Sequence, residues 1–244
     1  MFPKPTLYCN CFLNNEPRYT QINAIQKSLM CGAANLPLAY RNVLPDDFCF
    51  DDQGDNISHL NHWLGDLTGL YWIWKNTQDE FVGTTQYRRF WEEDVLVSIP
   101  YDENTIYISH HLYFPQGIYA QFLEPHAGPG LDILEYMANQ KIVDFPFFDQ
   151  LKTTQSLSTC NMFFAHRILF DKLCAIVFDL ALEMYDGIRY VLPSLSAKDK
   201  YQSRLVAYVI ERFLTIVYQN VNYYFGNNVK IQPMLMFEVP GKAK

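Results

Sequence analysis

The sequence lacks the long apolar runs and the motifs by which several protein classes are recognised. Acidic or basic residues interrupt its most apolar stretches, Leu173–Met184 and Val206–Tyr218, whereas a membrane span needs about 18 apolar residues in a row. No apolar segment follows the single lysine of Met1-Phe-Pro-Lys-Pro, so we expect no secretory signal. G-x-S-x-G, phosphate-loop and G-x-G-x-x-G motifs are also missing, which removes the usual basis for a hydrolase, an NTPase or an NAD enzyme.

Basic charge is scarce. The chain has 19 Lys and Arg against 26 Asp and Glu, a net charge of −7, and no long basic run. A nucleic-acid partner is therefore not expected, because phosphate neutralisation needs a basic surface. The Cys9-x-Cys11 pair has no second pair or nearby His to complete a zinc site. We expect all six cysteines to be reduced core thiols of a cytoplasmic protein: Cys9, Cys11, Cys31, Cys49, Cys160 and Cys174.

Apolar and aromatic residues, by contrast, are plentiful. The 244 residues are 49% hydrophobic and 18% charged, which excludes a disordered chain and is enough for one large domain. The 4 Trp, 17 Tyr and 18 Phe are expected mainly in the core. Some of them could present flat surfaces to a sugar or a base.

Segments with strand and helix patterns alternate along the chain. This alternation predicts an α/β domain with a central, mainly parallel sheet and a helical C-terminal part. Such sheets bind ligands beyond the carboxyl ends of their strands, here the loops after Phe12, Tyr40 and Gln86. The predicted strands are Thr6–Phe12, Leu38–Val43, Glu80–Tyr87, Thr159–Ala165 and Lys230–Glu238, with extended segments in Ser98–Ser109. The predicted helices are Tyr19–Ala34, a helix from Ser58 or Asn61 to Asn76, Gln116–Leu123, Leu131–Asn139, Arg167–Tyr185 and Lys198–Gln219.

Two polar segments could carry chemistry. The loop from Asp51 to Ser58 holds three carboxylates, an amide and a hydroxyl, which could bind a hard cation or sugar hydroxyls. It lacks EF-hand spacing, and a solvated loop with a helix cap explains it as well. The second segment places Arg88 and Arg89 among aromatic residues directly after a predicted strand. Paired guanidiniums suit a pyrophosphate, although they could equally form surface ion pairs with the acidic residues that follow.

A set of motifs resembles one bacterial family, long described as a domain of unknown function and associated with capsular and exopolysaccharide glycosyltransferases. The motifs are Asp55-Asn56-Ile57-Ser58, then Asn61, then Asp66-Leu-Thr-Gly-Leu-Tyr-Trp-Ile-Trp-Lys-Asn76, then Gln86-Tyr87-Arg88-Arg89-Phe90. Asn161-Met-Phe-Phe164 and Ile210-Glu211-Arg-Phe-Leu214 resemble two further segments of that family. The strong resemblance covers about residues 51–91, and weaker matches extend over most of the chain.

The resemblance implies a single GT-A-like, Rossmann-like domain over residues 1–244. Residues 1–110 would form its nucleotide-sugar-binding half and residues 111–244 its acceptor-side, helical half. The implied activity is transfer of a sugar from a nucleoside-diphosphate donor, expected to be UDP-linked, to a glycan or lipid-linked glycan during surface-glycan synthesis. The protein would then work in the cytoplasm or in peripheral contact with the inner face of the membrane.

The resemblance also assigns roles to individual residues. Asp66, Asn161 and Glu211 are the expected catalytic or substrate-facing polar groups. The residues expected at the donor and its diphosphate are Asn56, Ser58, Asn61, Gln86, Tyr87, Arg88 and Arg89.

Departures from the family pattern leave part of the chemistry open. Gln86 stands where the family has His and cannot be a general base. No Asp-x-Asp follows the Glu80–Tyr87 strand, so either Arg88 and Arg89 neutralise the leaving group without Mn²⁺ or Mg²⁺, or a carboxylate such as Asp55 supplies the metal site. We favour the arginines, since charge stabilisation is the main catalytic requirement. The alternatives are a non-catalytic carbohydrate-binding or scaffold protein, and a toxin-like transferase that modifies a protein.

Overall fold

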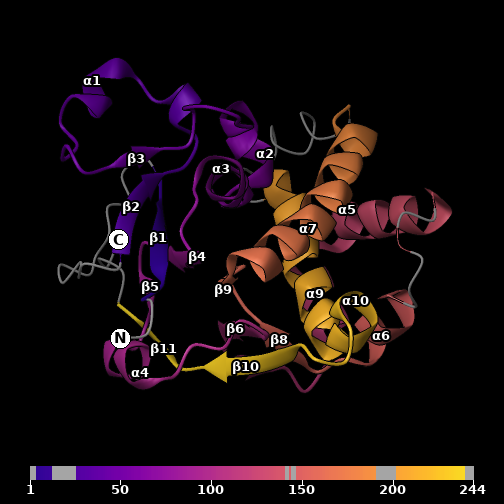
Figure 1. The fold of residues 1–244 in the computed structure, drawn as a ribbon. Helices are drawn as coiled ribbons and strands as arrows, with labels where there is room; N and C mark the ends of the chain where they lie inside the picture. Colours follow the sequence, from indigo (N-terminus) through magenta and orange to yellow (C-terminus); the bar gives the residue numbers. More distant parts are fainter. Residues whose placement is uncertain (1–3, 13–25, 141–142, 144–146, 191–201, 240–244) are drawn as a thin grey trace.

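A mixed β-sheet runs through the molecule (Figure 1). The computed structural model describes residues 4–12, 26–140, 143, 147–190 and 202–239. Within them the main path of the sheet has the order β10-β6-β9-β4-β1-β2-β3. These strands are β1 (Thr6–Cys11), β2 (Gln26–Met30), β3 (Cys49–Phe50), β4 (Phe81–Gln86), β6 (Thr105–Ser109), β9 (Phe163–His166) and β10 (Lys230–Met234).

The strands that carry the site are parallel. β1 pairs in parallel with both β2 and β4, and β2 with β3, so all four present their carboxyl ends at one edge. β9 runs antiparallel between β4 and β6, and β10 is parallel to β6. Shorter pairs lie beside this sheet: β5 (Arg89–Trp91) with β11 (Met236–Glu238), and β7 (His111–Tyr113) with β8 (Ser156–Ser158).

Gly83 allows β4 and β9 to approach closely. A Cβ atom at this position would lie 2.2 Å from the carbonyl oxygen of Phe163 and 2.2 Å from the Cβ of Phe164. Both of these neighbours belong to the antiparallel partner strand. Only glycine therefore fits here without separating the two strands.

The helices pack largely around α9 (Figure 1). α9 (Leu205–Gln219) is buried along most of its length and contacts α7 (Arg167–Ile188), α5 (Ile118–Gln140), α6 (Phe147–Thr153) and α2 (Asn61–Leu64). α3 (Leu67–Asn76) contacts α7. The remaining short helices are α1 (Leu38–Arg41), α4 (Glu93–Ser98) and α10 (Val221–Phe225). No helix in the described ranges is long and apolar enough to cross a bilayer.

The predicted fold class, α/β with a central, mainly parallel sheet, is confirmed. Most of the strands and long helices also lie where the patterns place them. Two predictions of element type are wrong. Residues 26–30 form strand β2 within the predicted Tyr19–Ala34 helix, whose residues 19–25 lie outside the described ranges. Leu38–Val43 is not a strand, since Leu38–Arg41 is a helical turn that leaves Leu38 exposed.

Two predicted helix boundaries are also wrong. The helices predicted on either side of Pro125 are one continuous helix, α5, which contains Pro125 and Pro129. Its buried face continues past the two prolines with His126 and Gly130. This packing outweighs the hydrogen bonds that proline removes. The helix predicted to reach Asn76 is interrupted at Gly65.

Candidate active site

Three adjoining cavities form a groove beyond the carboxyl ends of β1, β2 and β4. The strand-end cavity, of about 310 Å³, is lined by residues that follow β1 and β2, including Phe12, Gly32 and Asn35. The central cavity, of about 170 Å³, shares Phe12 and Arg204 with it. The third cavity, of about 460 Å³, shares four residues with the central one: Arg89, Cys160, Tyr208 and Glu211. The strand-end and third cavities share no lining residue, so the central cavity lies between them.

A carboxylate held by two amides lies in the central cavity. Gln86 Nε2 donates to Asp66 Oδ2 at 2.8 Å, and Asn161 Nδ2 lies 3.3 Å from the same oxygen. Burial is the main cause that raises the pKa of Asp66 to about 6, and the negative charge of Glu211 adds to it. The hydrogen bond from Asn161 and the positive charge of Arg204 act in the opposite direction. Asp66 therefore changes charge within the pH range in which a general base is useful.

A break between two helices positions Asp66. Gly65 has a φ of 56° and ends α2, and Asp66 is the residue directly before α3, with no cap hydrogen bond from its side chain. Asn61 Nδ2 donates to the carbonyl oxygen of Gly65 at 2.7 Å and to Thr68 Oγ1 at 3.0 Å. Asn61, predicted at the donor, thus fixes the Gly65 bend and also lines the strand-end cavity.

A strained turn positions Asn161. Cys160 and Asn161 lie between β8 and β9 with φ values of 73° and 50°, a left-handed conformation that is costly for residues with side chains. Contacts from two elements, β4 and α9, hold the turn. The carbonyl oxygen of Cys160 accepts from Gln86 Nε2 at 2.9 Å, and its amide donates to Glu211 Oε1. The carbonyl oxygen of Asn161 accepts from Thr84 Oγ1. The buried Oδ1 of Asn161 has no hydrogen-bond partner within the described chain.

Glu211 is engaged by other groups. Its Oε2 accepts from Arg212 Nη1 at 2.8 Å, and its Oε1 accepts from the amide of Cys160. Arg212 also donates to the carbonyl oxygen of Tyr208 and to Gln121 Oε1. Glu211, one of the predicted substrate-facing groups, lines the central and third cavities, and both of its oxygens accept hydrogen bonds from protein donors.

The two predicted arginines differ in position. Both pair with Glu238, Arg88 Nε at 3.1 Å and Arg89 Nε at 3.2 Å. Arg89 lines the central and third cavities, whereas Arg88 lines none of the three. Tyr87 lies edge-on to Phe12, at 6.3 Å between ring centroids, and is also outside the lining.

Arg204 is a groove residue that the sequence reasoning missed. Its guanidinium lies 5.3 Å from the centre of the Phe12 ring, and it lines both the strand-end and central cavities. Its side chain has no ion pair in the part of the chain that the structure describes. The predicted Lys198–Gln219 helix places Arg204 inside a helix, whereas in the structure α9 begins at Leu205 and Arg204 is its N-cap residue.

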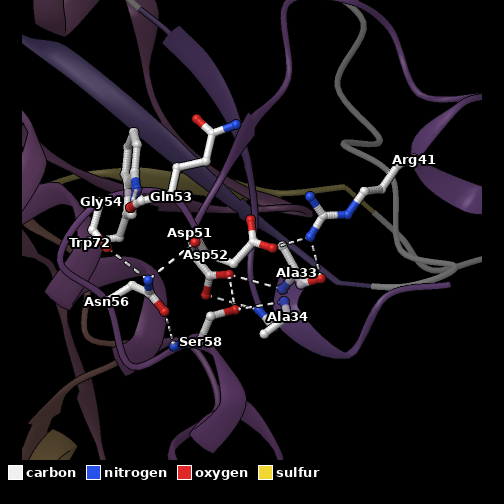
Figure 2. Close-up of polar contacts among 11 residues, drawn as sticks. Ala33, Ala34, Arg41, Asp51, Asp52, Gln53, Gly54, Asn56, Ser58 and Trp72 are labelled. Atoms are coloured by element: carbon white, nitrogen blue, oxygen red, sulfur yellow. Dashed lines mark hydrogen bonds and ion pairs between the residues drawn. The ribbon is translucent and has the colours of Figure 1, made fainter. Parts of the chain in front are cut away.

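The Asp51–Ser58 loop braces the protein (Figure 2). The fully buried carboxylate of Asp51 accepts from the amides of Gly32 and Ala33, both at 2.9 Å. Ser58 Oγ donates to Asp51 Oδ1 and accepts from the amide of Ala34 at 3.0 Å. The loop thus fixes the turn after β2 that contributes Gly32 to the strand-end cavity.

Neither Asn56 nor Asp55 lines the groove. Asn56 Nδ2 donates to the carbonyl oxygens of Asp52 and Gly54, at 3.1 and 2.9 Å (Figure 2). Asp55 is exposed and accepts from the Tyr71 hydroxyl at 3.2 Å. The described residues contain no group of three or more His, Cys, Asp or Glu side chains that could hold a metal ion.

Comparisons with known proteins give one family and one fold. Residues 20–222 match the model of a family described as a domain of unknown function (DUF4422). The apo structure of the bifunctional glycosyltransferase WbbM is similar over 98% of this chain, with a TM-score of 0.68 and 18% sequence identity. The match covers 46% of the WbbM chain. No curated protein matches the sequence. The chain therefore has the same fold as the matched part of WbbM, in line with the GT-A-like fold predicted.

Proposed function

This chain belongs to the DUF4422 family, and we propose that it transfers a glycosyl residue from a nucleoside-diphosphate sugar to a glycan acceptor. The observation that carries this proposal is the central cavity, where Asp66, with its raised pKa, lies in the same small space as Arg89 and Arg204. A carboxylate that can take a proton and guanidiniums that can bind phosphate oxygens are what transfer from such a donor needs.

The nucleotide would occupy the strand-end cavity, and its diphosphate the space toward the central cavity. Open α/β sheets bind nucleotides beyond the carboxyl ends of their strands, and the volume of this cavity, about 310 Å³, lies in the range of ligand pockets. Phe12 would cover one side of the base or ribose, and Asn35 and Asn61 offer amides to hydroxyl or carbonyl groups. Arg204, at the boundary of the two cavities, and Arg89 would stabilise the diphosphate as it leaves.

Asp66 is the proposed general base. It would accept the proton of the acceptor hydroxyl while that oxygen bonds to the anomeric carbon and the bond to the nucleoside diphosphate breaks. A single displacement of this kind inverts the anomeric configuration. Gln86 would position the base: its amide donates to both Asp66 and the Cys160 carbonyl, so replacement of the family's His at this point still leaves a carboxylate to do the chemistry.

The side chains that could ligate a divalent metal do not gather in the groove in a way that favours one. Asp55, the candidate ligand, is exposed and outside the cavity linings, and no acidic or His cluster of three occurs in the described ranges. We therefore propose that Arg89 and Arg204 neutralise the charge of the diphosphate, without a step through Mn²⁺ or Mg²⁺.

We further propose a UDP-linked donor and a glycan or lipid-linked glycan acceptor in capsule, exopolysaccharide or other surface-glycan synthesis, in the cytoplasm or at the inner face of the membrane. The family motifs support this setting, and WbbM, the structural neighbour, is itself a glycosyltransferase.

Thermal-shift titration with UDP, GDP, CDP and their sugars, with and without Mn²⁺, tests the proposal, followed by measurement of nucleoside diphosphate released from each donor that binds. We expect stabilisation by one nucleotide and slow hydrolysis of its sugar conjugate. Binding of glycans without turnover of any donor would instead favour a carbohydrate-binding scaffold protein.

A further inference from the structure

The third cavity has unused polar groups. Thr159 is 8% exposed, and its buried Oγ1 has no nitrogen or oxygen partner among the described residues, its one polar neighbour there being the Cys160 thiol. Nδ1 of His110 is buried and has no hydrogen-bond partner among the described residues. Both residues line the cavity. Leaving a buried polar atom unpaired is costly, so these two atoms indicate a ligand with hydroxyl groups.

The backbone fixes both groups in place. The carbonyl oxygen of Thr159 accepts from Ser109 Oγ at 3.0 Å, and Ser109 Oγ lies 2.9 Å from Ser158 Oγ. The amide of His110 donates to the carbonyl oxygen of Met234 at 2.9 Å. The side chains of Thr159 and His110 therefore project from a rigid frame formed by the ends of β6, β8 and β10.

The charges around the cavity are already paired. Arg212 Nη1 lies 2.8 Å from Glu211 Oε2, and Arg89 Nε lies 3.2 Å from Glu238 Oε2. All four residues line the cavity, and their charges cancel. A charged ligand would have to compete with the Glu211–Arg212 pair, whose two side chains are largely buried, whereas neutral hydroxyl groups would leave this ion pair intact.

The remaining lining is largely apolar and partly aromatic, with Phe114, Tyr208, Leu157 and Met236. Flat aromatic rings beside a few polar groups suit the C–H face of a sugar ring. The cavity volume, about 460 Å³, is typical of a ligand site. It opens into the central cavity next to Glu211, on the side away from Arg204.

We propose that the third cavity binds an uncharged pyranose, the terminal sugar of the acceptor, and that His110 and Thr159 select it by hydrogen bonds to its hydroxyl groups. This inference rests on the proposed function, since it places the acceptor opposite the donor across Asp66. It makes His110 and Thr159 determinants of acceptor specificity, with no part in binding the nucleotide.

Saturation-transfer NMR on the full chain with saturating UDP tests the inference. The probes are methyl β-D-glucopyranoside, methyl β-D-galactopyranoside and, as the charged counterpart, methyl β-D-glucuronide. We expect a neutral pyranoside to bind and the glucuronide to bind more weakly. Thr159→Val, which keeps the side-chain shape, and His110→Ala should each weaken neutral-sugar binding roughly fivefold to tenfold, the effect of one lost hydrogen bond.

Thr153→Val and His59→Ala are matched controls, because both residues are exposed and outside the groove; they should bind pyranosides like the wild type. Equal pyranoside binding by Thr159→Val, His110→Ala and wild type, absence of pyranoside binding, or preference for the glucuronide would overturn the acceptor inference. Failure of UDP and of every other nucleotide to stabilise the protein in the thermal-shift titration would instead overturn the proposed donor, a separate result that is obtained without any pyranoside.

Discussion

Replacement of Asp66 by Asn separates catalysis from stability. A general base typically contributes a factor of roughly 10² to 10⁴ to the rate, so Asp66→Asn should reduce kcat by about that factor. Wild-type kcat/KM should rise with pH around the Asp66 pKa of about 6 and level off above it. The residual activity of the variant should lack this inflection.

The same substitution should also change how the unfolding free energy of the protein depends on pH. Because the folded-state pKa of Asp66 is raised to about 6 from 3.8, the folded protein binds the proton more tightly than the unfolded chain does. The stability from this group is complete below pH 3.8 and is lost as pH rises through 6, a loss of roughly 3 kcal/mol at 1.36 kcal/mol per pKa unit. The unfolding free energy of the wild type should therefore fall relative to that of Asp66→Asn between about pH 4 and 7.

Urea denaturation at several pH values, run beside donor-turnover assays, measures both effects. Asp55→Asn is the control, since Asp55 is exposed and outside the groove, and it should match the wild type in rate. Wild-type turnover by Asp66→Asn, or a stability difference that does not change with pH, would refute the role and the environment assigned to Asp66.

Three further outcomes follow from the groove. Arg89→Ala should weaken nucleotide-sugar binding by about 1.5–3 kcal/mol through loss of a charge-assisted contact. Arg88→Ala, which loses the same Glu238 partner, should change the affinity measured by calorimetry far less. Equal losses would contradict the placement of Arg89 inside the groove and Arg88 outside it. Chelation by EDTA should leave turnover unchanged, and abolition of activity would point back to a metal site. Ser58→Ala should lower the unfolding free energy by about 1–3 kcal/mol, because it leaves the Ala34 amide and the buried Asp51 carboxylate short of a partner; an unchanged urea midpoint would argue against the brace.

Motifs located most of the candidate groove, although they could not show how its parts meet. Asp66, Gln86, Asn161 and Glu211 are far apart in the sequence, and the resemblance selected all four. Their convergence depends on the Gly65 bend and on the left-handed Cys160–Asn161 turn. Single-sequence patterns do not reveal these features, because long-range contacts stabilise them.

The motif could not separate the two arginines. Arg88 lies in the turn between β4 and β5, whereas Arg89 begins β5, and only Arg89 lines the groove. The strand formed by residues 26–30 is harder to foresee: helical spacing fits its apolar residues, and only pairing with β1 and β3 decides for a strand. The polar motif also did not reveal that Asn56 and Ser58 form hydrogen bonds within the protein, which hold the Asp51–Ser58 loop.

In the proposed function, the groove between Arg204 and Arg89 holds an activated sugar. Crystals grown with an intact, non-hydrolysable UDP-sugar analogue test it most directly. We expect the base beside Phe12, phosphate oxygens at Arg204 and Arg89, and the anomeric carbon facing Asp66. Density for the analogue elsewhere on the protein, with these side chains positioned as in the structure described above, would contradict it.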